Sequence, residues 1–211
     1  MKANMLPSLG ALLVTLSLAG CVRMPTWFSP TFSGQVVEQA TGQPIAGAIV
    51  VGLWEEERSA YVHSRIHCIR AESATTDAQG NYTLLRPGGD LPNRLYAYKS
   101  GYRYVEIRRI LKPIPAIPVR IDLEAFAGTT ATRLDDLSQL KGNASCDSAA
   151  ETGTLPNLLS LRKAIYQEAR AMAKSKEDHA IADQFLWGIE VIELGNRIAT
   201  ERSVERLRNR K

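Results

Sequence analysis

The spacing of hydrophobic and polar positions changes near Gly128 and divides the chain into two parts. Before this point, short runs of β-branched and aromatic residues alternate with turn sequences rich in Gly, Pro and Asp, which is typical of short strands. The run 81–85 alternates between polar and apolar residues, as a strand with one buried face does. We expect seven strands, over residues 35–38, 48–54, 68–75, 81–85, 94–99, 104–110 and 118–123.

After Gly128 the apolar residues recur every three or four positions, which is the period of amphipathic helices. One helix is predicted up to residue 172, with Thr154 as its N-cap, and a second begins at Ser175 and ends at Gly195-Asn196. A shorter helix is expected over 133–141. The predicted buried residues are Leu158, Leu161, Ile165, Ala169 and Met172 in the first helix and Ile181, Phe185, Ile189 and Ile192 in the second, while Arg162, Lys163, Glu168 and Arg170 are placed on a polar face.

These patterns predict a mainly β fold with appended α-structure. A seven-stranded antiparallel β-sandwich is expected over residues 32–127, and the helical extension 128–211 is expected to pack on it with two or three helices. The segment from Glu55 to His67 is longer than a hairpin requires. It forms either an insertion loop or a pair of extended strand ends.

The first residues follow the order of an export signal: one cation at Lys2, an apolar run over 5–18, then small residues before a cysteine. The sequence Leu18-Ala19-Gly20-Cys21 resembles the signal of bacterial lipoproteins. The resemblance implies that residues 1–20 are a signal peptide, that Cys21 is lipidated, and that 21–31 form a tether. Val22 follows the cysteine, which by the same analogy implies a lipid-anchored, periplasm-facing protein of the outer membrane. An ordinary secretion signal and an uncleaved anchor are the alternatives, although the run is shorter than the roughly 20 residues of a membrane span.

With Cys21 assigned to lipid, Cys68 and Cys146 remain. An even remainder in an exported protein predicts one disulfide, which would join the strand region to the helical region. The alternative is a redox-active or nucleophilic thiol, and no CxxC spacing supports it.

Composition and charge narrow the class of protein further. The chain is 45% hydrophobic and 23% charged, which is typical of a globular protein, and its formal net charge is +4. Its C-terminal tail is basic and either contacts anionic lipid or complements the dipole at a helix end. No aromatic residues are interleaved with these cations, so we expect no nucleic-acid binding. The cations of the tail are Arg197, Arg202, Arg206, Arg208, Arg210 and Lys211.

Four segments in the strand region carry a second resemblance: Gly34 to Glu38, Thr41 to Val50, Thr76 to Tyr82, and Lys99 to Tyr102. Together they resemble the carboxypeptidase regulatory-like domain, a transthyretin-like β-sandwich. In the turn motif Thr-Asp-x-x-Gly, the carboxylate of Asp77 is expected to accept backbone N–H groups, and Gly80 avoids a Cβ clash. The resemblance implies a non-catalytic module, because this domain accompanies the carboxypeptidase and supplies neither zinc ligands nor the catalytic carboxylate.

The remaining residues offer little chemistry. There is no HExxH, G-x-S-x-G or nucleotide-binding loop, so we predict no enzyme, no cofactor and no metal. His63 and His67 would share one face of an extended strand, where a surface metal site is conceivable and ordinary edge residues are the alternative. Convergence of these histidines with nearby carboxylates in one cleft would favour chemistry, whereas dispersal would favour binding. The carboxylates are those of Glu55, Glu56, Glu57 and Asp77.

Tyrosines around the Lys99 to Gly101 turn suggest a binding surface, and the alternative is that they form core beneath the helices. The candidates are Tyr96, Tyr98 and Tyr102. The sequence therefore predicts an outer-membrane lipoprotein that acts as a non-catalytic binding or structural module for an envelope protein, a peptide or a glycan. The alternative is an envelope enzyme, or an accessory subunit of one, with unrecognised catalytic groups.

Overall fold

The computed structural model describes residues 31–59, 64–86, 90–108, 118–146 and 155–208. All seven expected strands are present there, and they form two sheets. One sheet has the order β4-β1-β7, with β1 at Thr31–Glu38, β4 at Asn81–Leu85 and β7 at Val119–Leu123. The other has the order β3-β2-β5-β6, with β2 at Ile49–Ser59, β3 at Ser64–Thr75, β5 at Arg94–Tyr98 and β6 at Val105–Arg108.

The expectation of a wholly antiparallel sandwich is wrong at one pair of strands. Strands β1 and β7 run parallel, in a register from Gly34 opposite Val119 to Glu38 opposite Leu123. The other paired strands among the described residues are antiparallel. Because β1 and β7 are far apart in sequence, no hairpin turn imposes an antiparallel direction on them.

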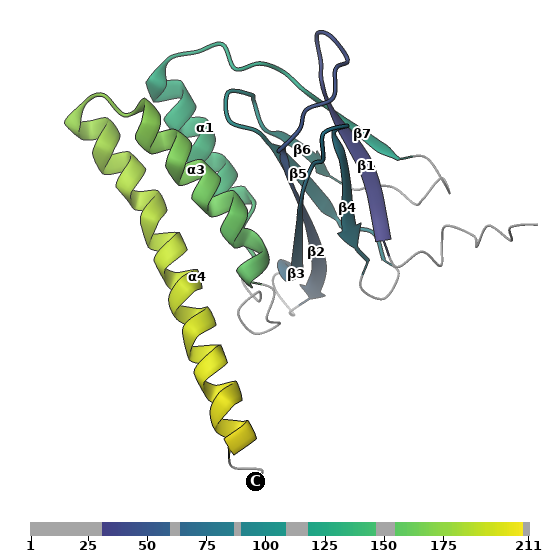
Figure 1. The fold of residues 1–211 in the computed structure, drawn as a ribbon, viewed down its shortest axis with the longest axis vertical. Coiled ribbons are helices and arrows are strands. Elements are labelled where there is room, and N and C mark those ends of the chain that lie inside the picture. Colours follow the sequence, from purple (N-terminus) through teal and green to yellow (C-terminus); the bar gives the residue numbers. More distant parts are fainter. Residues whose placement is uncertain (1–30, 60–63, 87–89, 109–117, 147–154, 209–211) are drawn as a thin grey trace, which may run out of the picture.

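The helices form a third layer on the outer side of the β3-β2-β5-β6 sheet (Figure 1). They are α1 at Thr130–Asn143, a 3₁₀ turn at Leu155–Leu158, α3 at Leu159–Met172 and α4 at Lys176–Arg208. Within the described residues these helices contain more residues than the strands, so "mainly β" understates the helical part.

Two apolar cores lie on either side of the β3-β2-β5-β6 sheet. Val50, Leu95 and Ala97 face the other sheet, where they join residues such as Val36 and Ile121. Their neighbours along the strands face the helices instead. Both faces of this sheet are therefore buried, and strands β2 and β5 show no polar face in their central residues. The helix-facing core includes Val51, Leu53, Tyr96, Tyr98, Leu134, Leu137, Leu161, Ile165, Phe185 and Ile192.

Helix α4 begins where the sequence predicts but ends much later. Ser175 Oγ accepts the backbone N–H of Asp178 at 3.0 Å, and the Asp178 carboxylate accepts the N–H of Ser175 at 3.0 Å, which forms a capping box. The predicted end at Gly195-Asn196 is wrong, because the helix continues to Arg208. A glycine inside a helix costs only about 1 kcal/mol relative to alanine, so it lowers local stability without ending the helix.

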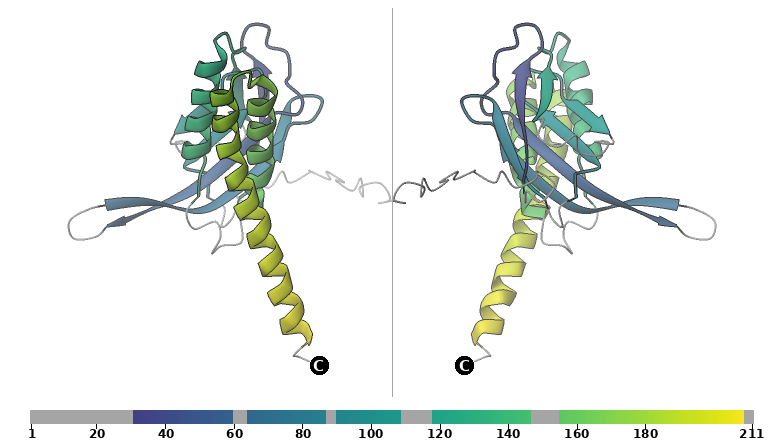
Figure 2. Two further views of the ribbon diagram at one scale, coloured as in Figure 1. Left: turned by 90° about the vertical axis from the view of Figure 1, so that its left-hand side faces the viewer. Right: turned by 90° about the vertical axis from the view of Figure 1, so that its right-hand side faces the viewer.

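The Glu55 to His67 segment forms extended strand ends. Strand β2 continues to Ser59 and β3 starts at Ser64, with a register shift between Trp54 and Glu55. Figure 2 shows this long hairpin projecting sideways from the body of the protein. Residues 60–63, at its tip, lie outside the described residues.

The Asp77 turn has the geometry that its sequence predicts. The carboxylate of Asp77 accepts the backbone N–H groups of Gln79 at 2.9 Å and Asn81 at 2.8 Å. The bond from Asn81 is the main reason that the pKa of Asp77 is lowered. Gly80 has a φ of 74°, and a Cβ there would lie 2.5 Å from the carbonyl oxygen of Val36. Only glycine fits this position without moving the β1 backbone.

The predicted disulfide is present between Cys68 and Cys146, with a Cα–Cα distance of 4.9 Å. It joins β3 to the segment that follows α1, across 78 positions of the sequence. Both residues belong to the helix-facing core. The bond thus links the strand layer to the helical layer. Cys21, the signal peptide and the tether up to residue 30 lie outside the described residues.

Candidate functional site

Two of the three tyrosines considered for a binding surface are core residues. Tyr96 and Tyr98 are 0% and 2% exposed and lie beneath the helices. Burial raises the pKa of both phenols. The Tyr96 hydroxyl lies 3.1 Å from the carbonyl oxygen of Asn143 at the end of α1. Tyr102 is half-buried and packs against the core between the two sheets. Of the two alternatives for Tyr96 and Tyr98, the structure bears out core and not a binding surface, because the helical layer covers the β5 side of the sheet.

A buried ionic cluster lies where the sequence predicts a polar helix face. Glu168 on α3 accepts two hydrogen bonds from Arg133 on α1, at 2.9 and 3.1 Å. It also accepts the hydroxyl of Tyr98 and the backbone N–H of Gly101. The Arg133 side chain is 1% exposed and that of Glu168 is 5% exposed. The guanidinium of Arg133 also lies over the ring of Phe126, 4.9 Å from its centroid. These contacts hold α1, α3 and the turn after β5 together.

The acidic and histidine side chains that could have formed a catalytic or metal site are dispersed. Glu55 on β2 forms an ion pair with Arg94 at 2.7 Å, and Glu56 is level with His67 across the β2–β3 hairpin. Asp77 lies in the turn after β3, beyond the opposite end of that hairpin. Within the described part of the chain, no three His, Cys, Asp or Glu residues gather in a way that could hold a metal ion. His63 lies outside that part.

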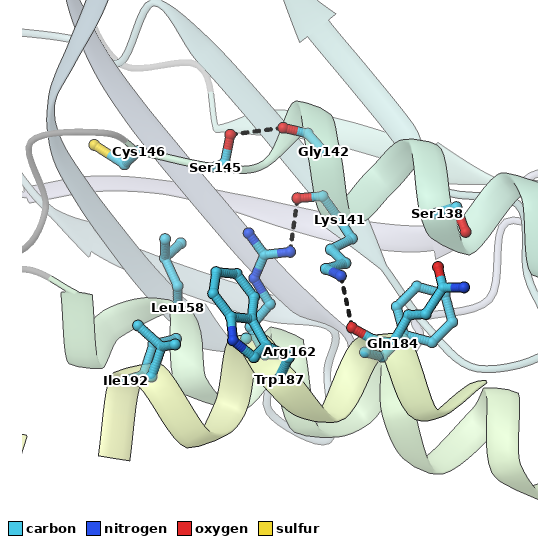
Figure 3. A pocket seen from close by; sticks show the side chains of 13 residues that line it. Ser138, Lys141, Gly142, Ser145, Cys146, Leu158, Arg162, Gln184, Trp187 and Ile192 are labelled. Atoms are coloured by element: carbon cyan, nitrogen blue, oxygen red, sulfur yellow. Dashed lines mark hydrogen bonds between the residues drawn. The ribbon is translucent and has the colours of Figure 1, made fainter. Parts of the chain in front are cut away.

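A groove of about 460 Å³ runs between α1 and α4. Figure 3 shows Lys141 and Gly142 on one wall, Gln184 and Trp187 on the other, and Arg162 between them. Its walls thus come from helices that are neighbours in space but separated in sequence by α3.

The two cations of the groove are engaged in structural contacts. Arg162 donates to the carbonyl oxygen of Lys141 at 2.6 Å and so satisfies a carbonyl at the C-terminal end of α1. Burial lowers the pKa of Arg162 to about 10. Lys141 Nζ donates to the carbonyl oxygen of Gln184 at 2.8 Å, and desolvation lowers its pKa. Arg162, like Glu168, was predicted to lie on a polar face, and both are buried because α1 covers that side of α3.

The side chains exposed at the rim of this groove and along α4 are apolar. Trp187 at the rim of the groove is 67% exposed, and it continues along α4 into Val191, Leu194 and Ile198, which are 42%, 52% and 40% exposed. We call these four residues the α4 stripe. Among the residues whose side-chain exposure the structure describes, only Ile66 and Leu85 are comparably exposed large hydrophobics, and neither belongs to such a row. Contiguous exposed apolar side chains mark interaction surfaces more often than scattered ones do.

The α4 stripe lies on the side of the helix away from its packed face. Phe185, Ile189 and Ile192 are buried between α4 and the rest of the helical layer, as the helical period predicts. The stripe residues are offset from them by two positions, which is about 200° around an α-helix. Helix α4 therefore has two apolar faces, and the face formed by the α4 stripe is 40–67% exposed. The sequence signal for it was present in the spacing 187, 191, 194, 198, but the predicted helix end at Gly195 interrupted it.

Neither a family model nor a curated protein matches this chain. Among solved structures, a 9R-lipoxygenase from Cyanothece PCC8801 is similar at 14% sequence identity and a TM-score of 0.24. The similarity covers 67% of this chain and 24% of the lipoxygenase, so the chain spans about a quarter of that structure's length. A similarity at this level carries no argument about fold or activity. Among the described helices, none combines the length and the apolar character needed to cross a bilayer.

Proposed function

We propose that this chain is a lipid-anchored protein of the cell envelope that acts as a non-catalytic binding module and docks a protein partner on the α4 stripe. The exposed row from Trp187 to Ile198 is the observation that carries this proposal. Trp and other large apolar side chains supply most of the binding energy at protein interfaces. The core beneath the first half of α4 reaches Ile192 and holds that part of the row in place, which lowers the entropy lost on binding.

The strand layers serve as the scaffold in this proposal. We propose that they form a carboxypeptidase regulatory-like β-sandwich of the transthyretin-like kind. The seven strands in two sheets and the Asp77–Gly80 turn support this assignment. In the same proposal, lipid on Cys21 holds the module at the periplasmic face of the outer membrane, and the lipoprotein-like sequence before that cysteine supports the anchor.

The anchor predicts a change in location when its cysteine is replaced. Cys21→Ser should move the protein from the membrane fraction to the soluble fraction and abolish incorporation of labelled fatty acid, because a serine hydroxyl cannot form the thioether. Fractionation and acyl labelling in a Gram-negative host measure both effects. Val22→Ser, which introduces the same residue one position later, is the matched control and should remain anchored. Recovery of the Cys21→Ser protein in the membrane with full acyl labelling would refute the anchor.

The docking surface predicts a position-dependent crosslink in cells. A photo-crosslinking amino acid at Leu194 should yield a discrete protein adduct, whereas the same amino acid at Thr83 should not. Thr83 is exposed on the outer side of the other sheet, away from the helices, and so is a matched control. Gel mobility and mass spectrometry of the adduct are the measurements. Absence of an adduct at Leu194, or equal adducts at both positions, would contradict the proposed docking surface.

A further inference from the structure

We infer that the partner on the α4 stripe is a second copy of this chain, whose α4 packs against the first in the antiparallel direction. This inference rests on the proposed docking function and adds the identity and the direction of the partner. The resulting dimer is symmetric, since each copy contributes the same surface.

The spacing of the stripe fits a pair of helices. Trp187, Val191, Leu194 and Ile198 are separated by four, three and four positions, which is the a/d pattern of a coiled-coil seam. A partner helix on this seam leaves the opposite face of α4 packed on α3, where the buried side chains already lie. Pairing two such seams removes the same apolar surface from water on both copies.

The residues beside the stripe select the antiparallel direction. Glu190 and Arg197 lie along one edge of the stripe and are exposed, while Gly188 and Gly195 lie along the other. When Val191 faces the partner's Leu194, Glu190 lies within two residues of the partner's Arg197, or about 3 Å along the axis. The two-fold symmetry of the dimer repeats this pair, so two opposite-charge pairs form across the interface. On the other edge Gly188 lies near the partner's Gly195, where the missing side chains let the two backbones approach closely.

Other occupants fit these edges less well. In a parallel pair, opposite edges of the two seams face each other, so the Glu190 edge lies along the partner's edge with Gly188 and Gly195, and no opposite-charge pair with the partner's Arg197 forms. An anionic membrane surface would meet the carboxylates of Glu190 and Glu201, both exposed near the stripe. Cations on both edges of an apolar stripe are what such a surface favours. The edge of the stripe that carries Glu190 and Arg197 has both signs of charge, and this mixture complements the same edge of a second α4.

The shape of the molecule leaves room for this arrangement. The C-terminal half of α4 extends beyond the sheets and beyond α1 and α3 (Figures 1 and 2). In the antiparallel pair this projecting half packs along the partner's body-proximal half, and the two bodies lie at opposite ends of the pair. Tethering to one membrane raises the local concentration of the copies, so a modest contact area suffices for association there.

The first test measures self-association of the full chain purified in mild detergent, by sedimentation equilibrium. The wild-type chain should form a reversible dimer. Leu194→Asp should weaken the dimer at least about tenfold, because it places an unpaired carboxylate on each side of the apolar seam. Thr200→Asp adds the same charge on the opposite side of the projecting half of α4 and should leave the dimer unchanged. Circular dichroism of each variant checks that the fold is retained, which the 52% exposure of Leu194 leads us to expect.

The second test concerns direction. Glu190→Arg should weaken the dimer, because the new cation faces the partner's Arg197. The double variant Glu190→Arg/Arg197→Glu should restore the dimer, because the opposite-charge pairs form again with their signs exchanged. A dimer that Glu190→Arg does not weaken, or that the double variant does not restore, would overturn the antiparallel arrangement.

The crosslinked adduct at Leu194 separates this inference from the proposed function. An adduct with the mass of two chains supports the second copy. An adduct of any other mass overturns the second copy and leaves the docking function standing, while no adduct overturns both. A wild-type chain that remains monomeric at its highest soluble concentration, or a dimer indifferent to Leu194→Asp, also overturns the inference.

Discussion

Replacing Glu168 with alanine should lower the free energy of unfolding by about 3–5 kcal/mol, because the substitution leaves a buried cation without its counter-charge. The guanidinium of Arg133 donates two hydrogen bonds to the Glu168 carboxylate and is almost fully buried. The backbone N–H of Gly101 would lose its acceptor, and the hydroxyl of Tyr98 would keep only the carbonyl oxygen of Ala164 at 3.2 Å. Each buried donor left without a partner costs about 1–3 kcal/mol.

Urea denaturation followed by circular dichroism measures this effect. Glu193→Ala is the matched control, because Glu193 forms its ion pair with Lys163 on the surface, with both side chains nearly half exposed. Exposed pairs contribute about 0–1 kcal/mol, so the control should remain near wild type. The double variant Arg133→Met/Glu168→Leu should recover part of the loss, since it removes both charges together. A Glu168→Ala protein as stable as the Glu193→Ala control would show that the cluster does not hold the layers together.

Removing the disulfide should have an effect of similar size. The double variant Cys68→Ala/Cys146→Ala should lose about 4 kcal/mol, because the bond closes a loop of 78 positions and so restricts the unfolded chain. Replacing the two cysteine side chains with the smaller alanine also reduces apolar packing in the helix-facing core, to which both positions belong. Both sulfur atoms are replaced in one variant so that no free thiol remains to pair with another cysteine.

Urea denaturation with and without a reductant measures the contribution of the bond. The wild-type chain should lose stability in the reductant, while the double variant should be indifferent to it, which makes the variant its own control. Mass spectrometry of the oxidised wild-type protein should show the peptides of Cys68 and Cys146 linked. Two free thiols in that protein, or a double variant with wild-type stability, would contradict the role assigned to the bond.

Both variants test the same architectural point. The sheet β3-β2-β5-β6 buries one face against the other sheet and the other face against the helices. The helical part is therefore no independent appendage, because Tyr96 and Tyr98 on β5 would be exposed without it. The Glu168 cluster and the disulfide both connect the strands to the helices. Loss of either should loosen the layer that presents the α4 stripe.

The positions of the strands were predictable because their signals are local. Turn sequences such as Thr76 to Gly80 act through the conformations of a few neighbouring residues, and strand β4 has the bounds that its alternation predicts. The capping box at Ser175 is local in the same sense. The pairing of Cys68 with Cys146 followed from the number of cysteines, because only these two remained once the resemblance of the N-terminus assigned Cys21 to lipid.

The errors concern contacts between distant segments. Whether Tyr96 is surface or core depends on a helical layer that begins more than thirty positions later. Glu168 follows the helical period of a polar residue, yet α1 and β5 supply a donor for each of its oxygens and so permit its burial. No property of the sequence near Glu168 specifies those donors.

By itself, the sequence determined the strands, the start of α4, the Asp77 turn and the candidate cysteine pair, because each depends on neighbouring residues or on composition. Only the tertiary structure decided the parallel β1–β7 pair, the burial of the tyrosines and of Glu168, and the exposure of one apolar face of α4. Burial is a property of what packs against a residue, and the residues that pack together here come from elements far apart in the chain. The candidate docking surface depends on the tertiary structure for the same reason, since it is the apolar face of α4 that the described elements leave 40–67% exposed.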